Sequence, residues 1–182
     1  MLKEIQLEDD SLCTAVKTCN LEIVNIILEF NSQPSYVNQE RKDGTALLIA
    51  VQYENLPIVK RLLSVPGIDP NFYGNKGITP LIEAMTNCNF DITDAIIDFY
   101  GDDKQSLKWQ FDIVIKDFFE LLNDTNLLNK SKKNKDEIIQ IISRILDTKC
   151  INPNYIDHTN TLLTYACRNN CIELVQKLLE YD

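Results

Sequence analysis

The residues of this sequence that could carry out chemistry are one histidine and six cysteines. A cysteine nucleophile paired with a histidine base would have to use His158, because the chain has no other histidine. The cysteines are Cys13, Cys19, Cys88, Cys150, Cys167 and Cys171. A zinc ion could in principle be bound by Cys150, His158, Cys167 and Cys171, since Cys167 and Cys171 are one helical turn apart.

Simpler roles account for these side chains. Cys167 follows the alanine of a repeated pattern, where we expect a small buried side chain, and Cys171 falls at a predicted turn between helices. His158 is predicted to lie in a polar turn. The chain has only five glycines, and neither G-x-G-x-x-G nor G-x-x-x-x-G-K-[ST] occurs. We therefore predict no catalytic residue, no metal site and no cofactor, and a protein that is not an enzyme.

Composition narrows the class of protein and of partner. The 182 residues are 45% hydrophobic and 25% charged, which is the balance of a folded domain, and we expect one domain over residues 1–182. The formal net charge of −9 argues against nucleic acid as a partner. The longest apolar run, Ala46–Val51, is far shorter than the roughly 20 residues of a membrane helix, so no membrane contact is predicted. With no C-x-x-C motif and no secretory leader pattern, we expect free thiols and a cytoplasmic location, with the nucleus as an alternative.

A repeat of about 33 residues organises the chain. In each copy a leucine precedes an alanine by three positions, and a second apolar block begins nine residues after that leucine. The pairs are Leu12 and Ala15, Leu47 and Ala50, Leu81 and Ala84, and Leu163 and Ala166. Agreement at this many positions indicates repeated structural units.

Each copy predicts a short helix, a turn and a longer antiparallel helix. Thr79 is a good N-cap residue, and Pro80 suits the first helical position. Leu81 and Ala84 share one face of the short helix, and the small alanine lets the second helix approach closely. One such pair cannot bury both of its faces, so neighbouring pairs must stack.

These motifs resemble the ankyrin repeat family. Gly77-Ile78-Thr79-Pro80-Leu81 with Ala84 closely matches the family signature G-x-T-P-L-x-x-A, and Asp43-Gly44-Thr45-Ala46-Leu47 with Ala50 matches it with one residue deleted. The clear resemblance covers about residues 10–99 and 137–182. It implies an all-α fold, an α-solenoid of stacked helix-turn-helix units. About five repeats are expected, at 9–38, 39–71, 72–104, 105–154 and 155–182, the fourth being atypical with a long first helix.

The chain departs from the family at the turn between the two helices of a repeat. The usual glycine is replaced by Cys19, Glu54, Cys88 and Asn170. Asparagine tolerates a left-handed backbone better than glutamate or cysteine. We therefore expect looser turns, and a stability below that of a consensus array by roughly 1 kcal/mol per lost backbone fit.

In the fourth repeat, hydrophobic periodicity replaces the motif. Apolar residues recur at helical spacing at Leu107, Phe111, Val114, Ile115, Phe118 and Leu122. Glu137 to Leu146 is predicted as the second helix. The lysine-rich loop from Asn123 to Lys135 is either a solvated connection or a docking patch for an acidic partner. Trp109 lies off the apolar stripe and is either a contact with a neighbouring repeat or an exposed anchor for a partner.

The resemblance implies a scaffold or adaptor that binds an unidentified partner protein on its concave face and turn tips. The family's variable binding positions fall on Lys42, Asp43, Gln52, Tyr53, Tyr73, Asn75, Lys76, Ile78, Asn87, His158, Arg168 and Asn169. The alternative is a regulatory or targeting segment of a larger enzyme whose catalytic domain lies outside this chain. Leu174, Val175, Leu178 and Leu179 are expected to lack a covering repeat, which predicts self-association or further repeats beyond the C-terminal helix.

Overall fold

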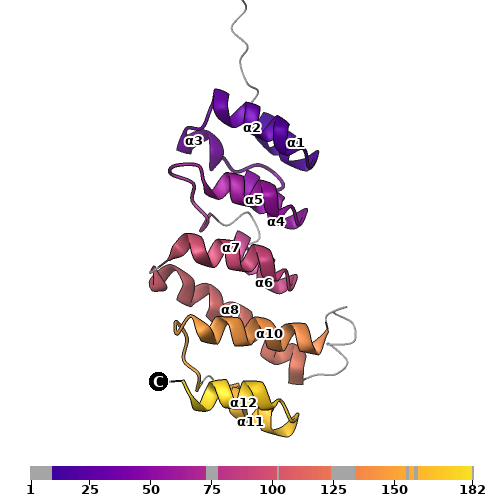
Figure 1. Cartoon of the computed structure of the whole chain (residues 1–182), viewed down its shortest axis with the longest axis vertical. Coiled ribbons are helices and arrows are strands. Elements are labelled where there is room, and N and C mark those ends of the chain that lie inside the picture. The colour runs from indigo at the N-terminus through magenta and orange to yellow at the C-terminus, as the bar shows by residue number, and fades with distance from the viewer. Residues whose placement is uncertain are drawn as a thin grey trace, which may run out of the picture. The chain divides into compact units, whose positions relative to one another are not determined.

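The computed structural model describes residues 10–72, 78–101, 103–123, 134–154, 156–157 and 160–181 (Figure 1). The chain divides into two compact units, residues 1–84 with 91–99 and residues 85–90 with 100–182. The described residues of both units are mainly helical, as the sequence predicts. Within the described ranges, no helix is both long and apolar enough to cross a membrane.

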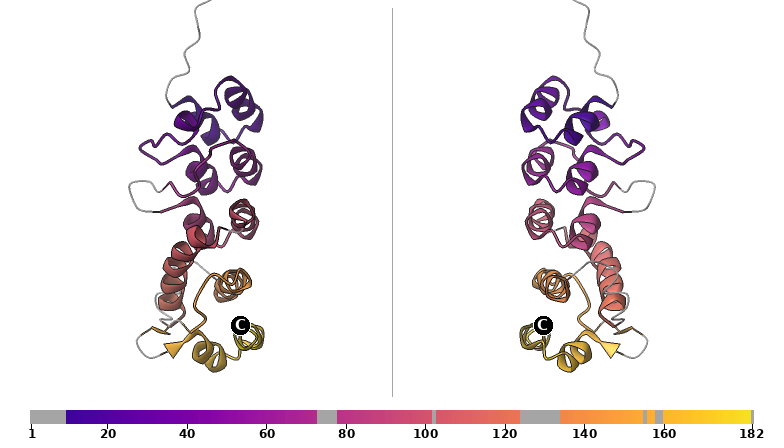
Figure 2. Two further views of the ribbon diagram at one scale, coloured as in Figure 1. Left: turned by 90° about the vertical axis from the view of Figure 1, so that its left-hand side faces the viewer. Right: turned by 90° about the vertical axis from the view of Figure 1, so that its right-hand side faces the viewer.

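The first unit is built from stacked helix pairs. Helix α1 (Ser11–Lys17) packs on α2 (Leu21–Phe30), and α4 (Ala46–Gln52) packs on α5 (Leu56–Leu63). A single helical turn, α3 (Pro34–Val37), lies between the two pairs in the chain. Because α1 contacts α4 and α2 contacts α5, one pair stacks directly on the other, which Figure 2 shows in a view nearly along the helices.

Threonine caps begin three of the first helices, as predicted. The Oγ1 atoms of Thr45, Thr79 and Thr161 each accept a hydrogen bond from the backbone N–H three residues later, at 3.3, 3.2 and 3.1 Å. These residues precede α4, α6 (Pro80–Thr86) and α11 (Leu162–Arg168). Each cap satisfies one of the N–H groups that the first turn of a helix leaves without a partner.

The predicted apolar positions form the core. Every residue of α4 from Ala46 to Val51 is buried, and Leu81 and Ala84 of α6 have no exposed surface. Ile92 and Ile96 of α7 (Phe90–Tyr100) are equally enclosed. The leucine and alanine of the first three copies are therefore buried as the pattern predicts, whereas in the last copy Ala166 is buried and Leu163 is only half-buried.

The turns between paired helices keep a left-handed residue although glycine is replaced. Cys19, Glu54, Cys88 and Asn170 all adopt the left-handed conformation, with φ between 52° and 56°. These residues therefore adopt the backbone conformation that glycine prefers, and the lower stability expected of these turns stays a prediction. The packing of the two helices imposes this geometry although a Cβ atom makes it unfavourable.

The second unit contains the predicted long helix. Helix α8 spans Lys104–Asn123 and contacts α10 (Lys135–Asp147), which in turn contacts α12 (Ile172–Leu179). The buried residues of α8 include Leu107, Phe111, Val114, Ile115 and Phe118, all of which belong to the predicted stripe. Trp109 is 38% exposed on the same helix. The lysine-rich connection between α8 and α10, residues 124–133, lies outside the described residues.

Two features of the last repeat differ from the sequence analysis. A short antiparallel pair, β1 (Ile156–Asp157) with β2 (Asn160–Thr161), precedes α11, so a small hairpin accompanies the helices. Leu174 and Leu178 are buried, so the expectation that they lack cover is wrong for these two, whereas Leu179 is 69% exposed as expected and Val175 is half-buried. The side of α12 that carries Leu174 and Leu178 packs against α11 and α10 within the unit.

Candidate partner-binding surface

The first unit has a hollow between α1 of the first repeat and the turn that precedes α4 in the second repeat. Its volume is about 420 Å³. The lining side chains come from α1 and from the turn before α4, and they are Asp10, Cys13, Thr14, Lys17, Arg41, Lys42 and Asp43. This surface is called the α1–turn hollow below.

Local backbone structure holds the turn that forms one wall. The backbone N–H of Arg41 donates to the carbonyl of Gly44 at 3.1 Å, and the N–H of Gly44 donates back at 3.0 Å. Gly44 has a φ of 112°, and a Cβ atom there would come within 2.7 Å of Cδ2 of Leu48. Glycine is needed for both reasons, so the position of Lys42 and Asp43 at the tip depends on Gly44.

An ion pair links the two walls of the hollow. Nζ of Lys17, the last residue of α1, lies 2.6 Å from Oδ2 of Asp43. The hydrogen bond from Lys17 and its positive charge lower the pKa of Asp43, and the same hydrogen bond raises the pKa of Lys17. Both side chains stay charged at neutral pH, with Arg41, Lys42 and Asp10 as further charges around them.

The thiol in the hollow is not set up for nucleophilic chemistry. Cys13 is buried, and this burial raises the pKa of its thiol above the ordinary value. Because the thiolate is the reactive form, a raised pKa keeps the sulfur protonated and unreactive at neutral pH. The hollow therefore offers charge and hydrogen bonding for recognition, with a structural cysteine at its base.

Three predicted residues come together at this surface, and a fourth, Gln52, precedes one of them in the chain. Lys42 and Asp43 line the hollow, while Gln52 and Tyr53 lie exposed at the end of α4. Tyr53 is 50% exposed, and it is close enough to Lys17 to contribute to the raised pKa of that lysine. Lys17 was not predicted, although it occupies the same place in the repeat as Gln52, five residues after the repeat leucine.

Four other predicted residues, Ile78, Asn87, Arg168 and Asn169, do not line this hollow. Ile78 is half-buried, and Asn87 and Arg168 are exposed. Asn169 is exposed but has a structural role, because its Oδ1 accepts from Nζ of Lys135 at 2.9 Å and its Nδ2 donates to the Tyr165 carbonyl at 3.0 Å. The remaining four predicted residues lie outside the described residues, and they are Tyr73, Asn75, Lys76 and His158.

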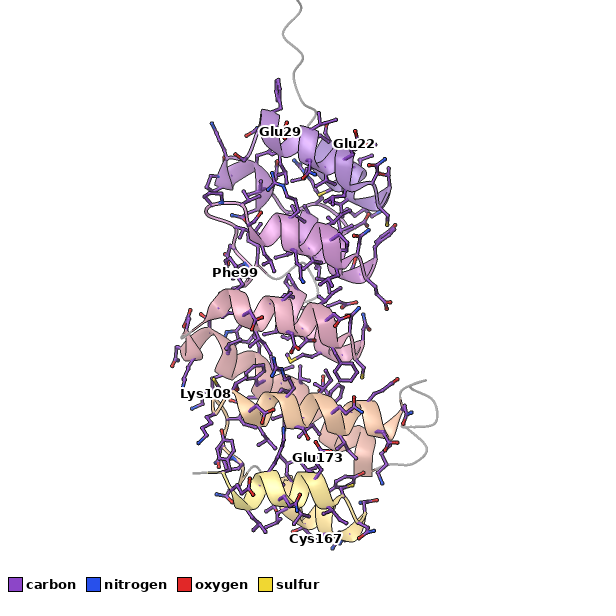
Figure 3. The ribbon with its side chains drawn as sticks, viewed as in Figure 1. Glu22, Glu29, Phe99, Lys108, Cys167 and Glu173 are labelled. Carbon is purple, nitrogen blue, oxygen red and sulfur yellow. The ribbon has the colours of Figure 1, made fainter. Side chains whose placement is uncertain are left out.

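One prediction about the cysteines is wrong. Cys167 is exposed (Figure 3), so the expectation that it fills a small buried position is wrong. It follows the buried Ala166 by one residue, which turns its side chain about 100° around the helix and into solvent. All six cysteines are free thiols, and no group of three or more His, Cys, Asp or Glu side chains suited to a metal occurs in the described part of the chain.

Comparisons with known proteins agree with the repeat architecture. A family model described as ankyrin repeats in three copies matches residues 12–108, more than half of the chain, and a model of the single ankyrin repeat matches residues 158–182. No curated protein sequence matches this chain. A solved ankyrin repeat domain from Acinetobacter baumannii aligns with a TM-score of 0.56 at 19% identity, covering 94% of this chain and 97% of the other. The ankyrin repeat protein EF0377 aligns with a TM-score of 0.55 at 18% identity, covering 97% and 100%.

Proposed function

Because the chain belongs to the ankyrin repeat family, we propose that it is a non-enzymatic adaptor whose partner protein docks on the α1–turn hollow and the neighbouring end of α4. Ankyrin repeats generally serve as protein–protein interaction modules. The observation that carries the proposal is the hollow itself, where side chains from two successive repeats converge. A partner that spans both repeats gains contacts that one repeat alone does not offer.

The chemistry of this surface suits a polypeptide partner. Lys17, Arg41 and Lys42 bring positive charge to a chain whose net charge is −9, and Asp10 and Asp43 place carboxylates beside them. Such a mixed pattern selects a partner segment that carries both signs of charge in the matching order. The cationic side favours carboxylates on the partner, and their approach is steered by the local field.

Tyr53 is the side chain on this surface best suited to anchor a partner. Half of it is exposed at the C-terminal end of α4, next to Lys17. Tyrosine is enriched among the residues that dominate binding energy, because a large rigid ring is desolvated at little cost in conformational entropy. We propose that Tyr53 packs against an apolar side chain of the partner while the charges around the hollow fix the orientation.

A face-specific crosslinking experiment tests the proposal. A photoreactive amino acid is placed at Tyr53 in one variant and, as a matched control, at Lys60, which is exposed on α5 of the same repeat. Partner protein should be crosslinked from position 53 and not from position 60. Crosslinking of the same partner from position 60 alone would contradict the proposed docking surface.

A substitution on the same surface measures the contribution of the anchor. Tyr53→Ala should weaken capture of the crosslinked partner by about tenfold or more, since interface anchors contribute roughly 2 kcal/mol. Lys60→Ala should leave capture unchanged. Thermal unfolding of both variants should stay close to that of the parent chain, because both side chains are exposed. A large loss of stability in Tyr53→Ala would instead make Tyr53 a packing residue.

A further inference from the structure

The second helices of the repeats have equivalent positions that can be compared directly. Ile23 of α2, Ile58 of α5 and Leu174 of α12 each lie three residues after the N-cap residue of their helix. Ile58 and Leu174 have no exposed surface, whereas Ile23 is 41% exposed. α5 contacts α2 and α12 contacts α10, so this position is buried in the two helices that pack on the second helix of a preceding repeat. In α2, the first of these helices in the chain, it is open.

A second position shows in which direction the open face points. Nε of Arg61 on α5 donates to Oδ1 of Asn25 on α2 at 2.8 Å. Lys177, the equivalent residue of α12, lies with Nζ 2.7 and 2.8 Å from the carboxylate oxygens of Asp147 on α10. Both cations reach the second helix of the preceding repeat. Ile26 occupies this position in α2 and is 61% exposed, so it faces the place of a preceding helix.

The opposite face is open on α12. Leu63 of α5 and Leu146 of α10 are only 9% and 2% exposed, but Leu179, the equivalent residue of α12, is 69% exposed. The next residue, Glu180, occupies the position at which Asp147 of α10 receives Lys177. α12 therefore presents to solvent a leucine equivalent to the buried Leu146 of α10 and a carboxylate equivalent to the one that receives Lys177.

We propose that a second copy of this chain covers these two faces, with α12 of one copy docking on α2 of the next in the register of neighbouring repeats. This occupant is favoured because it satisfies both open faces at once and reuses contacts that the chain already makes internally. In this register Leu179 of one copy lies against Ile23 and Ile26 of the other. The contact is heterologous, since each copy contributes a different face.

Charge sets the strength of this contact. Glu22 and Glu29, labelled on α2 in Figure 3, lie one turn to either side of Ile26, and Glu180 approaches from the other copy. Ile26 stands where Lys177 stands in the internal interface, so the junction lacks the cation that pairs with the carboxylate there. Like charges therefore oppose association at low ionic strength, and added salt should tighten it by screening them.

Sedimentation of mixtures tests the heterologous register. The purified full chain should associate with rising concentration, and more tightly at about 0.5 M than at about 0.05 M NaCl. Ile26→Glu and Leu179→Glu should each be monomeric alone, while their equimolar mixture should form a one-to-one dimer, because each variant retains the face that the other has lost. Both side chains are exposed, so the variants should fold, which circular dichroism checks. Ile113→Glu, at another exposed isoleucine, should associate like the parent chain.

A gain of affinity tests the register more finely. Ile26→Lys supplies the cation opposite Glu180 and should tighten association by about two- to fivefold at low salt, the range of an exposed ion pair. Glu180→Gln should remove that gain. A chain that stays monomeric at every concentration would overturn the proposal, as would a Leu179→Glu variant that still dimerises alone. A monomeric Ile26→Glu variant with a much lower unfolding midpoint would also overturn it, because Ile26 would then be a packing residue of its own chain.

Discussion

The second repeat and the α8–α10 pair bury their first helices in different ways. α4 has seven residues, and the first six, Ala46 to Val51, are buried. α8 has 20 residues and buries one stripe, while Trp109 and Ile113 on the same helix are 38% and 40% exposed. A helix can thus occupy the place of a first helix with or without the repeat motif.

The difference shows what the motif is needed for. α4 lies between α1 and α5, so adjacent residues of α4 face different neighbours and all must be small or apolar. α8 needs only a hydrophobic residue every three or four positions to cover its buried side. In α4, which carries the motif, nearly every position is constrained, although α11, which also carries it, leaves Cys167 and Arg168 exposed. Where the motif is absent, one face carries the constraint.

The largest expected effect is the loss in free energy of unfolding when adjacent residues on each helix are replaced by alanine. Leu48→Ala and Ile49→Ala in α4 should each lower the free energy of unfolding by about 2–5 kcal/mol. On α8, Phe111→Ala should cost about 3–5 kcal/mol, whereas the exposed neighbour Asp112→Ala should change it by less than about 0.5 kcal/mol. Urea unfolding followed by circular dichroism measures all four. Similar losses at Phe111 and Asp112, or a negligible loss at Ile49, would break the comparison.

A smaller effect concerns the buried amide of α8. Gln110 has no exposed surface, and its Nε2 donates to the hydroxyl of Tyr100 at 3.1 Å and to the carbonyl of Ser106 at 2.8 Å. Tyr100→Phe should cost about 1 kcal/mol, because a buried donor loses an acceptor. Ile49→Gln in α4 should cost more than Ile49→Ala, since that helix is enclosed by apolar side chains.

A double-mutant cycle separates this hydrogen bond from packing. Tyr100→Phe and Gln110→Met are combined, and their coupling should be about 1 kcal/mol, typical of neighbours that share a bond. Additive losses would show that the hydroxyl and the amide act independently. The buried polar group would then not distinguish α8 from α4.

Both regions have a left-handed residue after a helix, and replacing it with glycine should raise the free energy of unfolding rather than lower it. Glu54 after α4 and Lys149 after α10 have φ values of 52° and 53°. Glu54→Gly and Lys149→Gly should each raise the free energy of unfolding by about 1 kcal/mol, because glycine adopts this conformation without a Cβ clash. Glu54→Ala retains the Cβ atom and should give no gain, and Asn170→Gly should give less, since asparagine tolerates the conformation. Destabilisation by Glu54→Gly would show that its side chain contributes contacts worth more than the strain.

Much of the fold could be predicted from the sequence, because the determining signals are local. The Thr79 cap, the Leu81 and Ala84 face and the stripe of α8 each depend on spacing within about one to four helical turns. The hairpin before α11 and the exposure of Cys167 were not predicted. Two-residue strands carry no periodicity, and the sequence places Cys167 only one residue from a buried alanine.

The candidate site was predicted less well than the fold. Lys42, Asp43 and Tyr53 were identified from their place in the motif, whereas Lys17, Arg41 and Asp10 were missed. The hollow forms where two repeats meet. The position of the first repeat relative to the second decides which long side chains line it. The ion pair between Lys17 and Asp43, 26 residues apart, has no signature in either local segment.

The smallest effect compares two carboxylates that lie before first helices, Asp43 near α4 and Asp103 before α8. The Lys17 side chain lowers the pKa of Asp43, whereas hydrogen bonds from Ser106 lower that of Asp103, with Oγ of Ser106 2.6 Å from Oδ2. A lowered pKa means that the stabilisation is complete above the ordinary aspartate pKa and is lost as pH falls through the lowered value. Both groups are exposed, so we expect only a small contribution at the acid end of the stability profile.

The salt dependence of each pKa distinguishes the ion pair of Asp43 from the hydrogen bonds of Asp103. Titration of both carboxyl groups by NMR at low and at about 1 M NaCl should return the pKa of Asp43 toward its ordinary value, because the charge of Lys17 is screened at that ionic strength. The pKa of Asp103 should stay low, since its partners are neutral dipoles at hydrogen-bond distance. Lys17→Met should raise only the pKa of Asp43, and Ser106→Ala should raise only that of Asp103, and only part of the way because the backbone N–H of Ser106 still donates to it. An Asp43 pKa that stays low in Lys17→Met would assign the shift to other groups of the hollow and remove the ion pair as the link between its walls.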